Sequence, residues 1–547
     1  MRTSPEAIDE ATRAPVPPPT AADGGPSPEG SGRDLIGGVP GGVFPAWVWK
    51  AAPFVVGAFV VAGLILRFVA RSELWLDEAL TVNIAQVPFG DLVDTLKRDG
   101  SPPLFYVLLH VWIDLFGDSN VAVRALSGIF AVATLPAMWF AGRRLGGRTV
   151  AWLAFLLLTL SPFAIRYATE ARPYSLQILL VTLGVLALRR AFERPAPGRL
   201  AVVALVTGLL LYDAYWSLYL VGVTVVYLVV RSWRDAEPHP ARRTLAAVIV
   251  GCATFIPWVP TFLHQLEHTG TPWATPIALT TATGRAVIEF GGGFVPAGWL
   301  MGPVLGLVAL LGVFGVAIDR RRIELDLFTR PVTRHEAAVG FGTLLVGGGI
   351  AWVTAGAFEA RYAAVVLPMY LLVAAVGLLA FASRELRMVV VVALLALGLA
   401  GGIEAASVDR TQAGEVADVV NSRAAPGDIV GFCPDQVGPA VARIVDADVD
   451  MLAWPDGASP EFVDWTDYAE RNAATDPSAY AQILLDAAGD DGTVWLVWAA
   501  GYRTLEGSCE AVVTALQGAR PDTETMVTGS DEFYEFQSLT RFGPREP

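Results

Sequence analysis

Long apolar runs recur along most of this chain and constrain its fold more than any other feature. Crossing a bilayer as a helix takes roughly 17–25 residues. Eleven runs approach or reach that length, near 51–70, 120–141, 149–165, 173–190, 199–212, 214–231, 243–263, 296–318, 336–356, 362–381 and 387–405. The fifth and sixth are short, and one broken helix pair is the alternative there. Charged residues make up only 17% of the chain, against about 25% in soluble domains. The sequence therefore predicts an α-helical polytopic membrane protein with about eleven transmembrane helices.

Arginines in the short connections predict the orientation of these spans. Positive residues in short loops gather on the cytoplasmic side of a membrane. Every connection that follows an even-numbered span is basic, with arginines within 143–148, 189–199, 231–243, 320–334 and 384–387. We therefore expect a multi-pass protein of the plasma membrane, with its amino terminus in the cytoplasm and its carboxy-terminal part outside.

Composition divides the chain into three regions. Residues 1–48 are rich in Pro, Gly, Ala and Ser without apolar periodicity, which is typical of a disordered tail, here on the cytoplasmic side. Residues 49–408 hold the spans and a large first outer loop, 71–119. Residues 409–547 are expected to form a soluble extracytoplasmic α/β domain. From residue 410 onward the chain carries 24 acidic and 8 basic residues, and a basic face for nucleic acid is absent from the sequence.

The last region alternates helix and strand patterns. GEVADVVNSRAAP and EAVVTALQ predict helices, whereas DIVGFC, GTVWLVWAAG and FYEFQSLTRF predict strands. Cys433 and Cys509 both lie here, on the oxidising side, and a bridge between them would add about 4 kcal/mol in the chain-entropy model. Two unpaired thiols are the alternative. Cys252 lies in a span and is expected in the core. Acceptor recognition and glycan binding are both open as roles for this region.

Two carboxylates follow the first span directly. Asp77 and Glu78 stand in SELWLDEALTVNIAQ, at the boundary between membrane and water. Partial loss of hydration there makes a carboxylate a better proton acceptor. The alternative is an acidic pair that stabilises a helix N-terminus. Further along, Pro102 and Pro103 are suited to begin a helix, and the apolar stretch 104–116 is short enough to predict a helix in the membrane interface.

Arginines accompany aromatic residues on the same outer side. Arg124 falls in the first turns of the second span, where we expect it to pair with an anionic headgroup or a carboxylate, with snorkelling as the alternative. The turn SPFAIRYATEARPYSLQ brings together Arg166, Tyr167, Glu170, Arg172 and Tyr174, and FEARY adds Arg361 and Tyr362. A guanidinium can bind phosphate with two N–H groups at once. The alternative for the turn is an internal salt bridge that closes it.

A divalent cation is the one candidate cofactor, and its ligands are not identified. Glu170 is suited either to pair with an arginine or to bind a cation. His264 and His268 stand four residues apart, a spacing that fits a metal, with Glu267 between them. The glutamate pattern of a zinc protease does not accompany this pair, and we interpret these three as surface residues.

Four segments, taken in order, resemble a known group of enzymes. WLDEA, SPPLFYVLLHVWIDLFGDSNVAVRALSG, YATEARPYSLQ and ARYAAVVLP are similar to the polytopic C-type (GT-C) glycosyltransferases. The resemblance is nearest to the protein O-mannosyltransferase and aminoarabinose-transferase branch and to bacterial mannosyltransferase-like proteins. It covers roughly residues 45–405 and implies a GT-C-like membrane fold.

The resemblance also implies roles for particular residues. Asp77 would be the catalytic carboxylate, with Glu78 beside it. Arg124, Arg172 and Arg361 match positions that hold the carrier phosphate or shape the site. Relatives often carry a His in the hairpin that reads LYDAYWSLYL here, where this chain has Asp213 and Ala214. No metal or acceptor role is therefore carried over to that hairpin.

Residues and resemblance together predict a glycosyltransferase. It would move a sugar, mannose or arabinose, from a polyprenyl-phosphate donor to a cell-envelope glycan, lipid or protein at the outer membrane face, with inversion. A base for the acceptor hydroxyl and arginines at the leaving phosphate fit that chemistry. The alternatives are a lipid-linked substrate carrier or flippase and a non-catalytic scaffold. Few charges lie inside the spans, which counts against a transporter.

Overall fold

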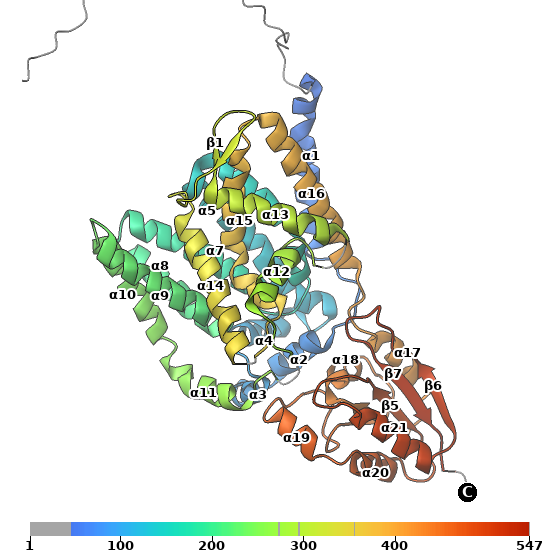
Figure 1. The fold of residues 1–547 in the computed structure, drawn as a ribbon. Helices are drawn as coiled ribbons and strands as arrows, with labels where there is room; N and C mark the ends of the chain where they lie inside the picture. Colours follow the sequence, from blue (N-terminus) through green and yellow to red (C-terminus); the bar gives the residue numbers. More distant parts are fainter. Residues whose placement is uncertain (1–44, 272–273, 294–295, 355, 546–547) are drawn as a thin grey trace, which may run out of the picture.

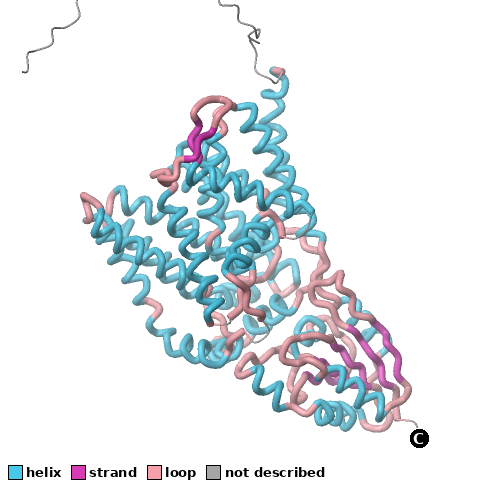
Figure 2. The backbone as a smooth tube through the Cα atoms, viewed as in Figure 1, coloured by secondary structure: helices cyan, strands magenta, loops and turns pink. Residues whose placement is uncertain are grey.

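The protein consists of a helical bundle with a sheet-containing part attached at one end (Figure 1). The structure is a computed structural model that describes residues 45–271, 274–293, 296–354 and 356–545. The tail expected over residues 1–48 lies almost entirely outside these ranges. Figure 2 shows helix through most of the bundle, whereas most strands gather in the carboxy-terminal part.

The bundle is built from long apolar helices joined by short turns. Its principal helices are α1 (Ala46–Leu66), α5 (Asn120–Thr159), α7 (Tyr174–Glu193), α8 (Pro197–Asp213), α9 (Trp216–Arg234), α10 (His239–Ala253), α13 (Pro296–Phe314), α14 (Arg334–Val353), α15 (Leu367–Gly377) and α16 (Arg384–Ser407). Shorter elements are α6 (Pro162–Ala168), η1 (Ile256–Trp258), α11 (Val259–His268), α12 (Leu279–Phe290), η2 (Ala360–Val365), η3 (Leu378–Ala380) and the hairpin β1 (Gly315–Ala317) and β2 (Ile323–Leu325).

A mainly helical, multi-pass membrane architecture is confirmed. Within the described ranges, seven helices are long and apolar enough to cross a membrane, and three shorter apolar helices accompany them. The count of eleven spans stays a prediction. Helix α5 counts once although two spans were expected there, because its two halves run together through a break at Gly146 and Gly147. The halves pack tightly: a Cβ added at Gly142 would lie 3.0 Å from the Ala151 Cα.

The first outer loop folds into three helices, α2 (Leu76–Gln86), α3 (Leu92–Asp99) and α4 (Leu104–Phe116). Helix α4 begins after the two prolines, as predicted. One of its sides buries Phe105 and Leu109, whereas Leu115 and Phe116 are exposed. An amphipathic helix of this length suits the membrane interface.

The carboxy-terminal part contains a five-stranded mixed sheet in the order β4-β3-β5-β7-β6. Strand β3 pairs in parallel with β4 and β5, and β7 pairs antiparallel with β5 and β6. The strands are β3 (Ile429–Cys433), β4 (Asp450–Ala453), β5 (Val494–Trp498), β6 (Thr523–Val527) and β7 (Ser538–Phe542). The helices are α17 (Ala413–Arg423), η4 (Asp435–Val437), α18 (Gly438–Ala442), α19 (Tyr468–Ala474), α20 (Pro477–Ala488) and α21 (Ser508–Ala519).

Strands β3, β5 and β7 fall within the segments whose patterns predicted strands. Strands β4 and β6 were missed, since both are largely exposed or half-buried and their apolar runs are very short. The central strands β3 and β5 are buried almost throughout, as expected for strands covered on both faces of a sheet.

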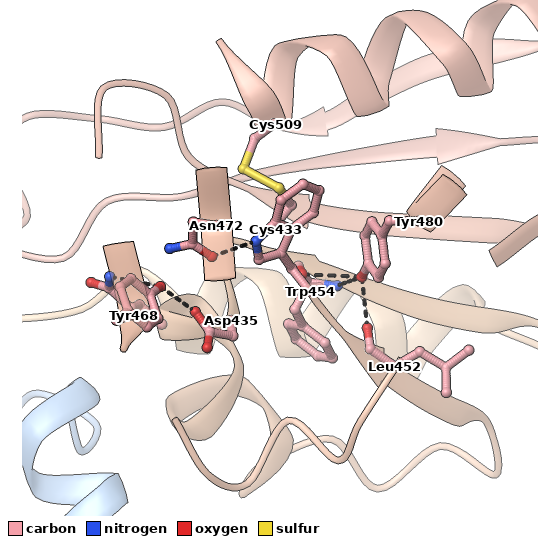
Figure 3. Close-up of a disulfide and its surroundings, with 10 residues drawn as sticks. Cys433, Asp435, Leu452, Trp454, Tyr468, Asn472, Tyr480 and Cys509 are labelled. Carbon is pink, nitrogen blue, oxygen red and sulfur yellow. Dashed lines mark hydrogen bonds between the residues drawn. A yellow bond between two sulfur atoms is a disulfide. The ribbon is translucent and has the colours of Figure 1, made fainter. Parts of the chain in front are cut away.

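A disulfide joins the end of β3 to the start of α21. Cys433 and Cys509 are bonded (Figure 3), so the bridged alternative holds. Two large buried side chains near the bridge have hydrogen-bond partners. The Trp454 indole N–H donates to the Asn472 side-chain oxygen at 2.9 Å. The Tyr480 hydroxyl donates toward the Leu452 carbonyl oxygen at 2.9 Å. These bonds allow large polar aromatic residues to be buried here.

Candidate active site

Helix α2 carries the two predicted carboxylates in its first turn. Asp77 and Glu78 directly follow Leu76, the first residue of the helix. The positive end of the helix dipole stabilises acidic side chains at these positions. The preceding residue, Trp75, offers no side-chain cap. A glutamate from the carboxy-terminal part supplies one instead: the Leu76 N–H donates to Glu535 Oε2 at 3.1 Å.

Glu78 is completely buried and forms a two-pronged pair with Arg124. Arg124 Nε and Nη2 donate to the two carboxylate oxygens at 2.8 and 2.7 Å, and the Ala171 N–H donates to Oε1 at 2.9 Å. Burial opposes the charge of Glu78, yet Arg124, Arg410 and the Ala171 N–H together hold the pKa of this carboxyl below its ordinary value. Glu78 therefore remains an anion that ties three segments together.

The pairing of Arg124 is thereby decided. Two further contacts run from its guanidinium to the carbonyl oxygens of Ser72 and Glu73, at 2.7 and 3.0 Å. The partner is a carboxylate of this chain, and the snorkelling alternative is wrong. The arginine is buried because its hydrogen bonds replace those it would make to water.

Asp77 lies beside two other arginines and remains partly open. Its Oδ2 atom is 3.3 Å from Arg361 Nη1 and 3.8 Å from Arg172 Nη2. The side chain is 19% exposed, compared with 0% for Glu78. Among the described residues, Oδ2 accepts no hydrogen bond. The structure thus brings together three predicted residues from three separate outer segments.

Packing orients both arginines. Arg172 Nη1 donates to Thr81 Oγ1 at 2.7 Å, and its guanidinium lies 5.9 Å from the Tyr174 ring centre. Arg361 lies 5.8 Å from the ring centres of Trp75 and Tyr362. Burial opposes the charge of each arginine, but the nearby Asp77 raises the pKa of both well above the ordinary value. Two permanent cations therefore face one carboxylate.

Glu170 pairs inside the chain. Arg166 Nε is 3.4 Å from Glu170 Oε1, four residues away, so a salt bridge within the turn is present. Arg410 lies 3.9 Å from the same oxygen and donates to the Thr169 carbonyl oxygen at 2.8 Å. Glu170 Oε2 accepts no hydrogen bond from the described part of the chain. The turn is thus held from both sides, by its own arginine and by one beyond the last span.

Three predicted tyrosines form the aromatic surroundings of the arginines. Tyr167 and Tyr174 meet edge to face with ring centres 4.9 Å apart. Tyr362 stacks on Trp216 at 5.5 Å. These rings enclose the arginines in a setting of low polarity, which strengthens their attraction for an anion.

The histidine pair lies apart from this cluster. The rings of His264 and His268 are 4.6 Å apart, and His268 Nδ1 is 3.0 Å from an Asp467 oxygen. Over the described ranges, no group of three or more His, Cys, Asp or Glu side chains is arranged to hold a metal. Asp213 is buried, and neither of its oxygens has a hydrogen-bond partner within those ranges.

Sequence reasoning missed three residues of this region, namely Arg410, Tyr534 and Glu535. Arg410 lies 3.6 Å from Glu78, Glu535 caps α2, and the Tyr534 ring meets Trp75 edge to face at 5.2 Å. All three belong to the region that was assigned to a separate domain. The only local signal was an acid flanked by aromatic residues in FYEFQ.

Comparisons with known proteins agree with this architecture. The model of the dolichyl-phosphate-mannose-protein mannosyltransferase family matches residues 100–259. No curated protein matches the sequence. Among solved structures, ArnT from Cupriavidus metallidurans in the apo state superposes with a TM-score of 0.61 at 14% identity, covering 90% of this chain and 98% of that one.

Two further structures have the same fold. ArnT from Cupriavidus metallidurans bound to undecaprenyl phosphate matches with a TM-score of 0.56 at 12% identity, over 91% of this chain and 98% of that one. The arabinofuranosyltransferase AftD from Mycobacteria matches with a TM-score of 0.51 at 13% identity, over 90% of this chain and 40% of that one. The resemblance to polytopic GT-C glycosyltransferases is confirmed: the chain has their fold.

Proposed function

We propose that this protein transfers a sugar from a polyprenyl-phosphate-linked donor to a cell-envelope acceptor at the outer face of the plasma membrane. The observation that carries the proposal is Asp77, a partly open carboxylate beside Arg172 and Arg361. This arrangement supplies the two groups that the reaction needs: a base and a cationic site for a leaving phosphate.

The reaction is a single displacement. Asp77 accepts the proton of the acceptor hydroxyl, whose oxygen attacks the anomeric carbon of the donor sugar. The bond between that carbon and the phosphate oxygen breaks, and the phosphate leaves with the electron pair. Arg172 and Arg361 stabilise the charge that develops on the phosphate. The Nε–H of Arg172 is buried and has no hydrogen-bond partner among the described residues. Attack from the opposite side inverts the anomeric centre.

The other predicted residues support these three. Glu78 and Arg124 act as a buried brace that fixes the start of α2 and the 169–172 turn. Arg166 and Glu170 hold that turn, and Tyr167, Tyr174 and Tyr362 shape the low-polarity wall around the arginines. In this proposal Arg124 acts through Glu78 rather than on the phosphate.

Several observations support the choice of donor and membrane side. One solved structure of the same fold contains undecaprenyl phosphate, and the positive-inside rule puts Asp77 on the outer face. The donor sugar is a hexose or a pentose, with mannose and arabinose as the candidates. The acceptor is a glycan, lipid or protein of the cell envelope. A carrier or flippase without transfer chemistry is not favoured by these comparisons.

The test is sugar transfer by the purified full-length protein in lipid. Radiolabelled polyprenyl-phosphate mannose, and then the arabinose analogue, are supplied with an envelope extract as acceptor. Wild type is compared with Asp77→Asn and with Asp91→Asn, a control at an exposed carboxylate of the same loop. We expect transfer by wild type and the control and none by Asp77→Asn. Carrier-lipid binding without transfer from either donor would overturn the proposal.

A further inference from the structure

The loop between β6 and β7 reaches out of the sheet and lies against the start of α2. Its backbone is held there by the segment that follows the last long helix. The Glu535 N–H donates to the Arg410 carbonyl oxygen at 2.8 Å, and the Gln412 N–H donates to the Glu535 carbonyl oxygen at 3.0 Å. The Gln412 side-chain oxygen also accepts from the Ser530 and Gln537 N–H groups. The loop therefore has a defined position beside Asp77.

Glu535 is suited to a site that already contains two carboxylates. Its side chain is buried, and one oxygen accepts the Leu76 N–H. Burial, with the added charges of Asp77 and Glu78, raises the pKa of Glu535 to about 8. Near neutral pH the side chain is therefore mostly protonated and caps α2 without adding a third negative charge. Moving the cap would move Asp77, which is one residue beyond Leu76.

Tyr534, the neighbouring residue, presents an open aromatic ring. Its edge-to-face partner Trp75 is only 5% exposed, whereas Tyr534 is 57% exposed. The Arg361 guanidinium also contacts Trp75 and lies 5.8 Å from the centre of its ring. The charges of Arg361 and Asp77 both act on the Tyr534 hydroxyl. The exposed ring thus lies near the Asp77–Arg361 pair, to which it is linked through Trp75.

The exposed Tyr534 ring has the chemistry that binds a sugar ring. The C–H face of a pyranose or furanose packs well on an aromatic ring, and the phenol hydroxyl can donate to or accept from a sugar hydroxyl. We propose that the β6–β7 loop completes the transfer site: the exposed Tyr534 ring, supported by the buried Trp75, forms a binding surface for a sugar ring, and Glu535 is a positioning residue for α2. This inference rests on the proposed function, since it assigns a sugar-binding surface to the same site.

The sugar ring that binds belongs either to the donor or to the acceptor, and kinetics separates the two. Tyr534→Ala is compared with Tyr534→Phe, which keeps the ring, in titrations of each substrate at saturating levels of the other. We expect Tyr534→Ala to raise one KM about tenfold and Tyr534→Phe to stay near wild type. A raised donor KM assigns the donor sugar, and a raised acceptor KM assigns the acceptor. Two unchanged KM values with unchanged kcat would overturn the inference while leaving the proposed function intact.

A binding measurement decides the matter if wild type shows no transfer. Wild type and Tyr534→Ala in nanodiscs are titrated with polyprenyl-phosphate mannose, its arabinose analogue and bare polyprenyl phosphate. Tighter binding of a sugar-bearing lipid that is lost in Tyr534→Ala supports the sugar surface without any catalysis. Equal binding of all three lipids, and of an envelope glycan fraction titrated in the same way, by both proteins overturns it.

Glu535 has its own test. Glu535→Ala removes the cap and should lower kcat roughly fivefold with little change in either KM. Glu535→Gln keeps an oxygen for the Leu76 N–H and should restore kcat. Glu532→Gln, at an exposed position of the same loop, is the matched control. A drop in kcat for Glu535→Gln equal to that for Glu535→Ala would contradict the positioning role.

Discussion

Asp77 and Glu78 are adjacent in the sequence, yet they lie in opposite environments. Glu78 is fully buried and has hydrogen bonds from a guanidinium fork and a backbone N–H. Asp77 is partly exposed, and its Oδ2 has only ionic neighbours at 3.3 and 3.8 Å. The oxygens of Glu78 are occupied by hydrogen bonds that hold the fold together, whereas Asp77 has a buried Oδ2 between two arginines and a side chain that still reaches solvent. The comparison predicts that the two residues fail in different ways when changed.

The largest expected effect is the loss of activity in Asp77→Asn. Removing a general base costs roughly 10²–10⁴-fold in rate. Stability should also fall, because Arg172 and Arg361 lose the counter-charge beside them, but the loss of rate should exceed what the loss of folded protein explains. Transfer assays and thermal unfolding of the same preparation check both. A variant that retains full transfer would show that Asp77 is not the base.

Glu78→Gln should show the converse pattern. It leaves the buried guanidinium of Arg124 without its counter-charge, and breaking a buried pair costs about 3–5 kcal/mol. We expect a strongly lowered unfolding temperature in detergent, and activity should be lost only as far as folded protein is lost. The double variant Glu78→Gln/Arg124→Met tests the pairing, since it should be more stable than Glu78→Gln alone. Equal stability of the two variants would argue against the brace.

Lysine substitutions at the arginines beside the two carboxylates should have smaller effects, which differ between the Asp77 and Glu78 environments. Arg172→Lys and Arg361→Lys keep the charge but lose the planar fork, so donor KM should rise by about tenfold while stability is nearly unchanged. Arg124→Lys should instead lower stability, because Arg124 holds Glu78 through two N–H groups. Titrations with donor lipid and melting curves for the three variants separate these outcomes. The same change in donor KM and in melting temperature for all three variants would contradict the different roles assigned to Asp77 and Glu78.

The smallest expected effect is a pH dependence from Glu535. Its pKa is about 8 in the folded protein against an ordinary 4.5, so between these values the unfolded state releases a proton that the folded state keeps. The contribution of Glu535 to the free energy of unfolding therefore falls as the pH rises from about 4.5 to about 8, and then levels off. The unfolding temperature of wild type should drop more between pH 5 and pH 8 than that of Glu535→Gln. Parallel curves for the two proteins would contradict the assignment.

Much of the helical architecture could be predicted because its signals are local. Apolar runs marked the long helices, and the prolines at 102 and 103 marked the start of α4. The break in α5 falls in the connection that was expected between two spans from the ends of the apolar runs and from the arginines at 143–148. Strands β4 and β6 were missed because their apolar runs are too short to be distinctive, and pairing with their neighbours in the sheet defines them as strands.

The residue types of the candidate site could be listed from the sequence, but their pairing could not. Hydropathy and spacing by themselves placed Asp77, Glu78 and the arginines at one membrane boundary, since both are properties of short segments. Only the tertiary structure decided that Arg124 meets Glu78 while Arg172 and Arg361 meet Asp77, because neighbouring side chains on a helix point in different directions. It alone brought Glu535 to Leu76, 459 residues away along the chain. Contacts at that separation depend on how the two parts pack, and no local pattern encodes them.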